Sequence, residues 1–244
     1  MSAALPAISA HRGGGEIARA GTWEAFRAAL DASSEYVEFD VRLTRDGTWV
    51  VYHDEHVGLR RRPVRSLYHD ELSELVGYAV PEATAVMEIL AKRVIGHLDL
   101  KEHHREEEIV GAAIEIFGAG GFVATTECAA SIRRIRAFAP AVRTALSTGN
   151  PRLARSQRVG PRLRNRRFDL NRIIDSGASW VALNHRLASD KVLKQCRRHD
   201  VGVMLWTVNT PDLIARHLTD RRIDVLITDR PKFAAGVRAR LAAA

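Results

Sequence analysis

The chain has 244 residues, of which 46% are hydrophobic and 27% charged, and its formal net charge is +8. This length can bury one large α/β core and no low-complexity linker divides it, so we expect a single domain over residues 1–244. The N-terminus has no basic segment followed by a long apolar stretch, which predicts a cytoplasmic protein without signal peptide or membrane span, and Cys128 and Cys196 match no disulfide or zinc pattern.

The first apolar run, Ala7 to Ala10, is followed at once by His11-Arg12-Gly13. The second, Tyr36 to Val41, alternates polar and apolar residues, so Glu38 and Asp40 project from the same face of a strand. Two carboxylates aimed one way repel each other unless a cation lies between them. Oxygen ligands suit Mg²⁺ or Ca²⁺, and we therefore expect these two residues to hold a divalent cation.

A hairpin is expected directly after this strand. The segment Thr44 to Thr48 contains Asp46-Gly47, which is typical of a tight turn, and Trp49 to His53 has the pattern of a returning strand. The hairpin would bring His53 back to the two carboxylates.

The next strand, Val94 to Leu100, also alternates and places His97, Asp99 and Lys101 on one face. Asp99 and Lys101, an acid and a base two residues apart, could simply neutralise each other in a barrel core. Beside the first two carboxylates, we instead expect Asp99 to be a third metal ligand and Lys101 a fixed positive charge for an anionic substrate. His97, one layer deeper, is expected to be a core histidine.

Nine apolar runs are candidate strands, and removing the hairpin strand leaves eight. Apolar residues recur at helical spacing after Thr22, Ser189, Thr210-Pro211 and Pro231, residue types that are typical of helix starts. Strand and helix alternating to a count of eight predicts a TIM barrel with a β-hairpin excursion after its second strand. Besides the strands named above, the candidates are Gly121 to Thr126, Val142 to Ser147, Ser179 to Asn184, Gly202 to Val208 and Ile223 to Thr228. In a TIM barrel the carboxyl ends of the strands carry the chemistry.

From about Ile8 to Phe233 the chain resembles the glycerophosphodiester phosphodiesterases. The resemblance rests on six segments in order: SAHRGGG, TWEAFRAAL, VEFDVRLTRDGTWVVYHD, HLDLK, LWTVN and IDVLITDRP. It implies a TIM barrel in which His11 and His53 act in acid/base catalysis and the Glu38 and Asp40 carboxylates hold the metal. Trp206 resembles a family tryptophan at the mouth of the pocket, although a tryptophan in a barrel strand can also belong to the core.

Two departures from the family pattern concern the pocket. Where the family usually has Pro-Glu-Asn-Thr, this chain has Arg19-Ala20-Gly21-Thr22, so only the threonine is kept. The late metal ligand is Asp99 rather than the usual glutamate, as in the related sphingomyelinase D and phospholipase D toxins. The first change alters the pocket wall and leaves the core chemistry in place. The second puts the leaving group in question, but not the diester chemistry.

The activity implied is hydrolysis of glycerophosphodiesters, or of related lipid-derived phosphodiesters, to an alcohol and glycerol phosphate. The metal, Arg12 and Lys101 would offset the charge of the diester, while one histidine takes a proton and the other gives one. Which of His11 and His53 is the base stays open. Two alternatives also remain: a lyase of the phospholipase D toxin type that releases a cyclic phosphate, and a non-catalytic barrel that binds anionic lipid.

Basic residues are concentrated in one region. Ser131 to Arg172 holds twelve arginines and one acid, a charge of +11, so the rest of the chain sums to −3 against a total of +8. The arginine-rich loop, residues 149–171, could be a solvated surface segment or could recruit an anionic membrane surface. Nucleic-acid binding is not expected, because Phe168 is its only aromatic residue.

Overall fold

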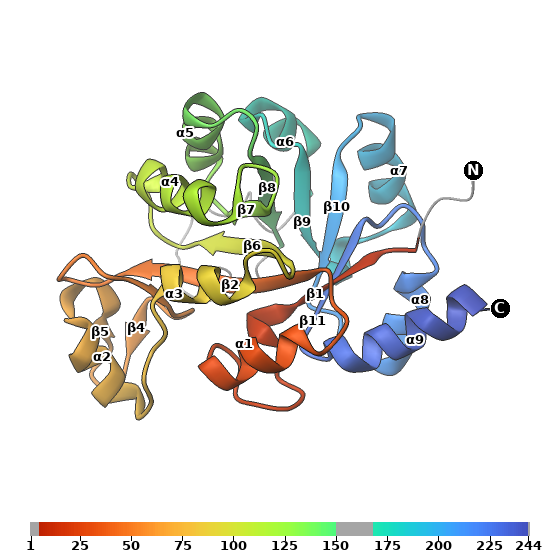
Figure 1. Ribbon diagram of the computed structural model, residues 1–244. Helices are drawn as coiled ribbons and strands as arrows, with labels where there is room; N and C mark the ends of the chain where they lie inside the picture. The colour runs from red at the N-terminus through yellow and green to blue at the C-terminus, as the bar shows by residue number, and fades with distance from the viewer. Residues whose placement is uncertain (1–4, 150–167, 244) are drawn as a thin grey trace.

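The computed structural model describes residues 5–149 and 168–243, and Figure 1 shows a barrel of strands enclosed by helices. Within these residues eight parallel strands pair in sequence and close, because the last strand pairs with the first. The predicted TIM barrel is therefore confirmed. Its strands are β1 (Ala7–Ala10), β2 (Tyr36–Leu43), β6 (Ile95–Leu100), β7 (Phe122–Thr126), β8 (Arg143–Thr148), β9 (Trp180–Asn184), β10 (Gly202–Trp206) and β11 (Val225–Thr228).

Helices alternate with these strands, and the four whose starts were predicted, α1 (Trp23–Leu30), α7 (Asp190–Arg198), α8 (Pro211–Leu218) and α9 (Pro231–Ala243), begin at those places. The hydroxyls of Thr22 and Ser189 accept hydrogen bonds from the first turns of α1 and α7, and Pro211 is the first residue of α8. The helices around the barrel are α1 (Trp23–Leu30), α3 (Ala83–Leu90), α4 (Glu106–Phe117), α5 (Ala129–Phe138), α6 (Leu170–Ser176), α7 (Asp190–Arg198), α8 (Pro211–Leu218) and α9 (Pro231–Ala243), with short 3₁₀ turns η1 (His11–Gly13) and η5 (His185–Leu187).

The predicted hairpin follows β2. The strand β3 (Trp49–Val51) pairs antiparallel with the end of β2, and Gly47 in the connecting loop has φ 83°, a value that favours glycine. Because of this pairing β2 runs to Leu43, two residues past the predicted end at Val41.

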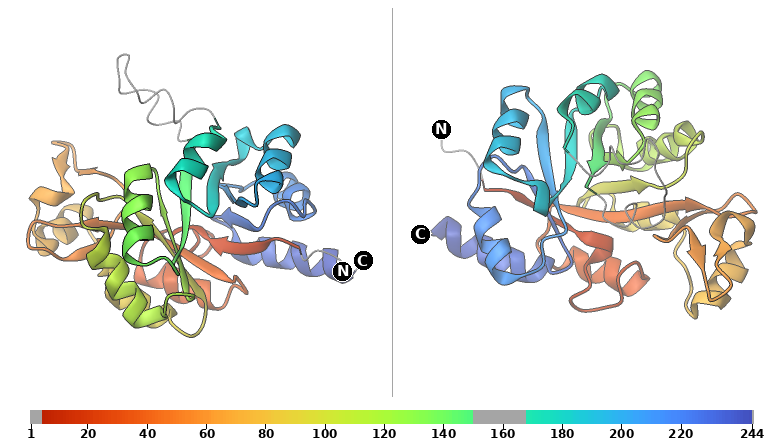
Figure 2. Two further views of the ribbon diagram at one scale, coloured as in Figure 1. Left: turned by 90° about the horizontal axis from the view of Figure 1, so that it is seen from above. Right: turned by 180° about the vertical axis from the view of Figure 1, so that it is seen from behind.

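An unpredicted small unit comes next in the chain. It contains β4 (His56–Val57), β5 (Arg62–Pro63), η2 (Val64–Ser66) and α2 (His69–Val76), and it lies on the opposite side of the barrel from α7, α8 and α9 (Figures 1 and 2). Two-residue strands have no periodicity, so their pattern could not be recognised in the sequence. The unit has its own apolar cluster, made of Val50, Val57, Val64, Leu67, Leu72 and Val80.

Alternation along β2 separates the two faces of the barrel wall as predicted. Val37, Phe39 and Val41 point outward and are buried against the helices, whereas Glu38 and Asp40 point inward. Fully burying an apolar side chain of this size contributes about 1.5–3 kcal/mol, so the register of β2 is strongly fixed. The carboxylates are thereby held in the barrel interior. An apolar cluster fills the interior, made of Tyr36, Val123, Ala145, Ala182, Met204, Val225 and Ile227.

The two cysteines are free thiols. Cys196 is buried in the apolar layer between helices and barrel, and Cys128 is partly buried just before α5. No helix in the described ranges, 5–149 and 168–243, has the length and apolar character needed to cross a membrane.

Helices α4 and α5 are joined by an ion pair with a predictable pH dependence. Burial raises the pKa of Glu106, but hydrogen bonds from Arg134 and Ser131 outweigh it and lower the pKa from 4.5 to about 2. The carboxylate of Glu106 receives two hydrogen bonds from Arg134, of 2.8 and 2.7 Å. This contribution to stability is complete above pH 4.5 and is lost as the pH falls from 4.5 towards 2.

We expect Glu106→Gln to lower the free energy of unfolding at pH 7 by about 1–3 kcal/mol, because it leaves a partly buried guanidinium without its charge partner. Urea denaturation at pH 7 and pH 3 measures this. The difference between wild type and variant should shrink at pH 3. The adjacent, exposed Glu107→Gln is the matched control, and an equal loss in both variants would contradict the assignment.

Candidate active site

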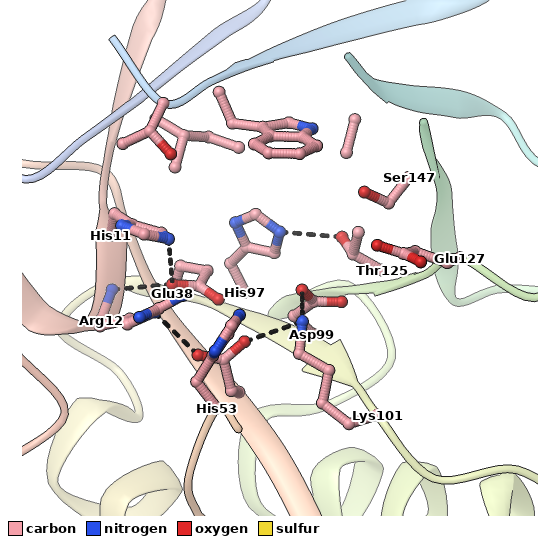
Figure 3. Close-up of a pocket in the computed structure, with 15 residues that line it drawn as sticks. His11, Arg12, Glu38, His53, His97, Asp99, Lys101, Thr125, Glu127 and Ser147 are labelled. Carbon is pink, nitrogen blue, oxygen red and sulfur yellow. Dashed lines mark hydrogen bonds and ion pairs between the residues drawn. The ribbon is translucent and has the colours of Figure 1, made fainter. Parts of the chain in front are cut away.

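Polar side chains from distant segments meet at the carboxyl ends of the barrel strands, around a cavity of about 300 Å³ (Figure 3). η1 follows β1 directly, β2 and β6 contribute inward-facing residues, and the chain after β3 returns to the same rim. This is the end of the barrel at which TIM-barrel sites form. All eight site residues expected from the sequence line this cavity: His11, Arg12, Glu38, Asp40, His53, Asp99, Lys101 and Trp206.

Three carboxylates form the acidic part of the cavity. The parallel register of β2 and β6 places Asp40 beside Asp99. Each of Glu38, Asp40 and Asp99 has one carboxylate oxygen that lies within 4.8 Å of the corresponding oxygens of the other two. Glu38 and Asp40 are each only 3% exposed. Converging carboxylate oxygens are the donors that hard divalent cations prefer.

The electrostatics of these carboxylates fit a bound cation. Burial and the neighbouring charge of Asp40 raise the pKa of Glu38 to about 7. The Oδ1 atom of Asp99 is buried and accepts no hydrogen bond from the described residues. A buried acceptor without a donor costs about 1–3 kcal/mol, and a cation at this place would satisfy it. The donor set suits Mg²⁺ and Ca²⁺ equally, because both take oxygen ligands.

Two cations contact the same carboxylates. Arg12 Nε lies 2.9 Å from one oxygen of Asp40, and Lys101 Nζ lies 2.9 Å from the other and 2.5 Å from Asp99. Burial raises the pKa of Asp40, but Lys101 and Arg12 outweigh it and hold that pKa well below its usual range. Both cations therefore lie on the cavity wall beside the acidic cluster.

The conformation of Arg12 is unusual and links it to this cluster. Its φ of 52° lies in the left-handed region, which is uncommon for a residue other than glycine. In that conformation its backbone N–H donates a 2.7 Å hydrogen bond to Glu38 Oε2. Backbone strain of this kind persists where the surroundings hold it and is frequent at functional sites.

His11 is held by a carboxylate that sequence reasoning did not identify. Its Nδ1 lies 2.6 Å from Asp229 Oδ1, just after β11, and its Nε2 lies 4.0 Å from Glu38 Oε2. The side chain of Asn209 donates to the other oxygen of Asp229 at 2.5 Å. Burial lowers the pKa of His11, but the charge of Glu38 and the hydrogen bond with Asp229 outweigh it and raise the pKa. The ring is thus oriented with Nε2 towards the acidic cluster.

His53 has a different environment. Its Nδ1 lies 2.8 Å from Asp54 Oδ1, and its backbone carbonyl accepts a 3.0 Å hydrogen bond from Arg42. Burial lowers the pKa of His53, and the charge of Asp40 offsets this only in part. The pKa values of the two histidines are therefore displaced in opposite directions from that of free imidazole.

His97 is a satisfied core histidine, as expected. It is 2% exposed, its Nδ1 lies 3.2 Å from Ser9 Oγ, and its Nε2 lies 2.8 Å from Thr125 Oγ1. Burial lowers its pKa to about 3, so the ring is neutral at pH 7. It forms the floor of the cavity.

The rest of the wall comes from the later strands. In Figure 3, Thr125, Glu127 and Ser147 lie across the cavity from His11 and Arg12. Trp206 at the end of β10 also lines the cavity, and its indole Nε1 is buried without an acceptor among the described residues. The tryptophan therefore belongs to the cavity as well as to the barrel core.

Sequence reasoning missed Asp229, Asn209, Asp54 and Glu127. Asp54 and Asp229 stand in segments that the family resemblance quoted, YHD and ITDRP, but neither had been given a role. A carboxylate next in sequence to a histidine expected to be catalytic is a usable signal for Asp54. No local pattern points from Asp229 to a histidine 218 residues away.

Asp229→Asn tests whether Asp229 orients His11 and raises its pKa. The change removes a negative charge that raises the pKa of His11, so we expect the limb of the pH profile of kcat/KM that reports His11 to shift to lower pH. We also expect kcat to fall by about 10- to 100-fold, the size of effect typical of lost orienting partners. Steady-state kinetics between pH 5 and pH 9 measures both. An unchanged profile would show that Asp229 does not act through His11.

The arginine-rich loop predicted for residues 149–171 lies mostly outside the described residues. At its edges, β8 ends at Thr148, and α6 is capped by Asp169. Arg172 donates a 2.6 Å hydrogen bond to the backbone carbonyl of Glu127. The predicted contact with an anionic membrane surface therefore stays a prediction.

Comparison with known proteins agrees with the sequence analysis. The sequence model of the glycerophosphoryl diester phosphodiesterase family matches residues 11–85. YhdW of Bacillus subtilis strain 168, named as a candidate glycerophosphodiester phosphodiesterase, is 25% identical over 93% of this chain and 95% of its own length.

Solved structures show the same fold. A glycerophosphodiester phosphodiesterase from Parabacteroides distasonis superposes with a TM-score of 0.79 at 19% identity, covering 98% of this chain and 99% of its own. An Oleispira antarctica phosphodiesterase, in complex with the product sn-glycerol-3-phosphate, gives 0.76 at 18% identity, covering 96% of each chain. The barrel predicted from the sequence is thereby confirmed, and the predicted resemblance to the glycerophosphodiester phosphodiesterases is confirmed by the family model and by YhdW.

Proposed function

We propose, from the relationship of this chain to the glycerophosphodiester phosphodiesterase family, that it hydrolyses glycerophosphodiesters or related lipid-derived phosphodiesters to an alcohol and glycerol phosphate. One observation carries the proposal: three carboxylates that fit one cation share a cavity with two histidines, each hydrogen-bonded to its own carboxylate. A barrel that only binds anionic lipid has no need of this arrangement. The relative solved with sn-glycerol-3-phosphate supports glycerol phosphate as the product.

Glu38, Asp40 and Asp99 would hold a divalent cation, Mg²⁺ or Ca²⁺. When bound, it offsets negative charge on the phosphodiester as a Lewis acid. Arg12 and Lys101, already next to these acids, add fixed positive charge for the phosphate. The unsatisfied indole N–H of Trp206 supplies a hydrogen-bond donor for a substrate oxygen.

The two histidines divide the proton transfers. The raised pKa of His11 favours its protonated form, which suits the acid that protonates the departing alkoxide. The lowered pKa of His53 favours the neutral form, which suits the base that takes the proton of the nucleophile. Their partners, Asp229 and Asp54, keep each ring in one orientation.

The nucleophile follows from the substrate. Glycerol phosphate diesters carry a hydroxyl next to the phosphate, and its attack on phosphorus expels the alcohol and forms a cyclic phosphate. The base receives the hydroxyl proton and the acid supplies one to the alcohol, so the protons balance. Water then opens the ring to the monoester. A lyase would stop before this second step.

Domain organisation, location in the cell and contact with a membrane form the last part of the proposal. We propose that residues 1–244 act as one domain in the cytoplasm, in the turnover of lipid head groups. The arginine-rich loop, with its excess of positive charge, would bring the enzyme to an anionic membrane surface by salt-sensitive attraction.

Phosphorus NMR tests the reaction. The purified protein is incubated with glycerophosphocholine, glycerophosphoinositol or lysophosphatidylcholine, each with Mg²⁺, Ca²⁺ or EDTA. We expect a phosphomonoester to form in the presence of metal from at least one substrate. A cyclic phosphate that persists would replace the hydrolase by the lyase, and no reaction of any substrate would favour the binding barrel.

A further inference from the structure

A second hollow of about 140 Å³, the side pocket, adjoins the catalytic cavity. It is lined by residues of three segments, 19–21, 51–54 and Tyr78, and it shares Arg12, Asp40 and His53 with the central cavity. Because the same three side chains border both spaces, a group bound in the side pocket can be part of a molecule whose phosphate lies at the catalytic residues. The side pocket is therefore placed to receive one of the two ester arms of a diester.

Arg19, an exposed residue, contributes a guanidinium to the wall of the side pocket. Its guanidinium carbon lies 4.3 Å from the centre of the Tyr78 ring, a cation–π contact. The Tyr78 ring carries no charge, so this contact leaves the charge of the guanidinium without an anionic partner and its N–H groups available as donors. Among the described residues no carboxylate forms an ion pair with Arg19.

The two acids of the side pocket already have cationic or imidazole partners. Asp40 is paired with Arg12 and Lys101 at 2.9 Å each, and Asp54 with His53 at 2.8 Å. Tyr52 and Tyr78 lie on the same wall. Burial raises the pKa of both phenols, so at pH 7 they are neutral and their hydroxyls can donate hydrogen bonds. Among the described residues, the side pocket thus offers a ligand the guanidinium of Arg19, which forms no ion pair, and neutral phenol donors.

We propose that the side pocket binds the alcohol arm of the substrate, and that Arg19 makes the enzyme prefer an alcohol carrying an anionic group over a neutral or cationic one. This rests on the proposed function, since it concerns the leaving group of the same reaction. A guanidinium forms charge-assisted, often paired hydrogen bonds with carboxylate or phosphate oxygens, and it gains nothing of this kind from an ammonium group.

Three synthetic esters of sn-glycerol 3-phosphate test the preference. Their alcohols are glycolate, which is anionic, glycolamide, which is neutral and nearly the same size, and ethanolamine, which is cationic. The measured quantity is kcat/KM, and the key number is the ratio of the glycolate ester to the glycolamide ester. Comparing this ratio between protein variants cancels the different intrinsic reactivities of the two esters.

We expect Arg19→Gln to lower that ratio by about tenfold or more, the size of effect expected from losing a hydrogen bond to a charged group. The rate with the glycolamide ester should change little. Arg19→Lys keeps the charge and should retain part of the preference. Arg65→Gln, at an exposed arginine of η2 outside both pockets, is the control for a change in overall charge.

The outcomes are distinct. An unchanged ratio in Arg19→Gln, or an equal loss with all three esters, would overturn the role of Arg19 in selecting the alcohol. If the wild-type protein cleaves none of the three esters nor glycerophosphocholine, the proposed function itself is wrong. Cleavage of all the esters by the wild type, with a ratio that depends on Arg19, supports both statements.

Discussion

Replacing His11 or His53 with Asn should lower kcat for a glycerophosphodiester by about 10²- to 10⁴-fold, the range that general acid/base groups contribute. A carboxylate holds Nδ1 of each ring, and Nε2 of His11 lies 4.0 Å from Glu38 Oε2. Asparagine keeps a polar side chain of similar size but cannot exchange a proton near neutral pH. KM should change much less than kcat, because Arg12 and Lys101, the cations proposed to bind the phosphate, stay in place.

The same assay with a matched variant isolates the catalytic role. His199→Asn changes an exposed histidine that follows α7, and we expect it to leave kcat unaltered. Circular dichroism and the unfolding midpoint show whether each variant keeps its fold. Near-normal turnover in either His11→Asn or His53→Asn would remove that residue from the catalytic pair.

The second large effect concerns the cation. Glu38→Gln and Asp99→Asn should each weaken the affinity for Mg²⁺ or Ca²⁺ by more than the roughly 10- to 100-fold typical of lost outer-shell partners, because each removes a charged ligand. Asp99 is the more informative position, since its Oδ1 accepts no hydrogen bond from the rest of the described chain. Isothermal titration of metal-free protein measures the affinity without reference to turnover.

Removing one carboxylate from the acidic cluster also changes how much the metal stabilises the folded protein. Asp99→Asn reduces repulsion within the acidic cluster but also removes an ion-pair partner of Lys101, so the informative quantity is the stabilisation by metal, which should be smaller in the variant than in wild type. Glu88→Gln, on the exposed face of α3, is the control for loss of one negative charge. Equal metal affinity in Asp99→Asn and wild type would contradict the ligand assignment.

Local periodicity explains why most of the site could be predicted. Alternation along β2 and β6 decides that Glu38, Asp40 and Asp99 face the barrel interior, since their neighbours Phe39 and Leu98 must be buried outside it. The Asp46-Gly47 turn then determines that β3 returns beside β2, which brings His53 to the same rim.

Contacts that depend on barrel closure could not be predicted in this way. Asp229 reaches His11 because β11 pairs with β1, a pairing between the two ends of the chain. The side pocket likewise depends on Arg19 and Tyr78, two loop residues whose meeting no strand period determines. Loop conformation is set by tertiary packing, so its sequence signal is weak.

The most direct test of the central claim is turnover by metal-stripped wild-type protein with glycerophosphocholine, followed by phosphorus NMR before and after a divalent cation is added. We predict that the diester signal stays constant in EDTA and that a phosphomonoester appears once Mg²⁺ or Ca²⁺ is in excess. Formation of the monoester at the same rate with and without metal would contradict a metal-dependent reaction at Glu38, Asp40 and Asp99.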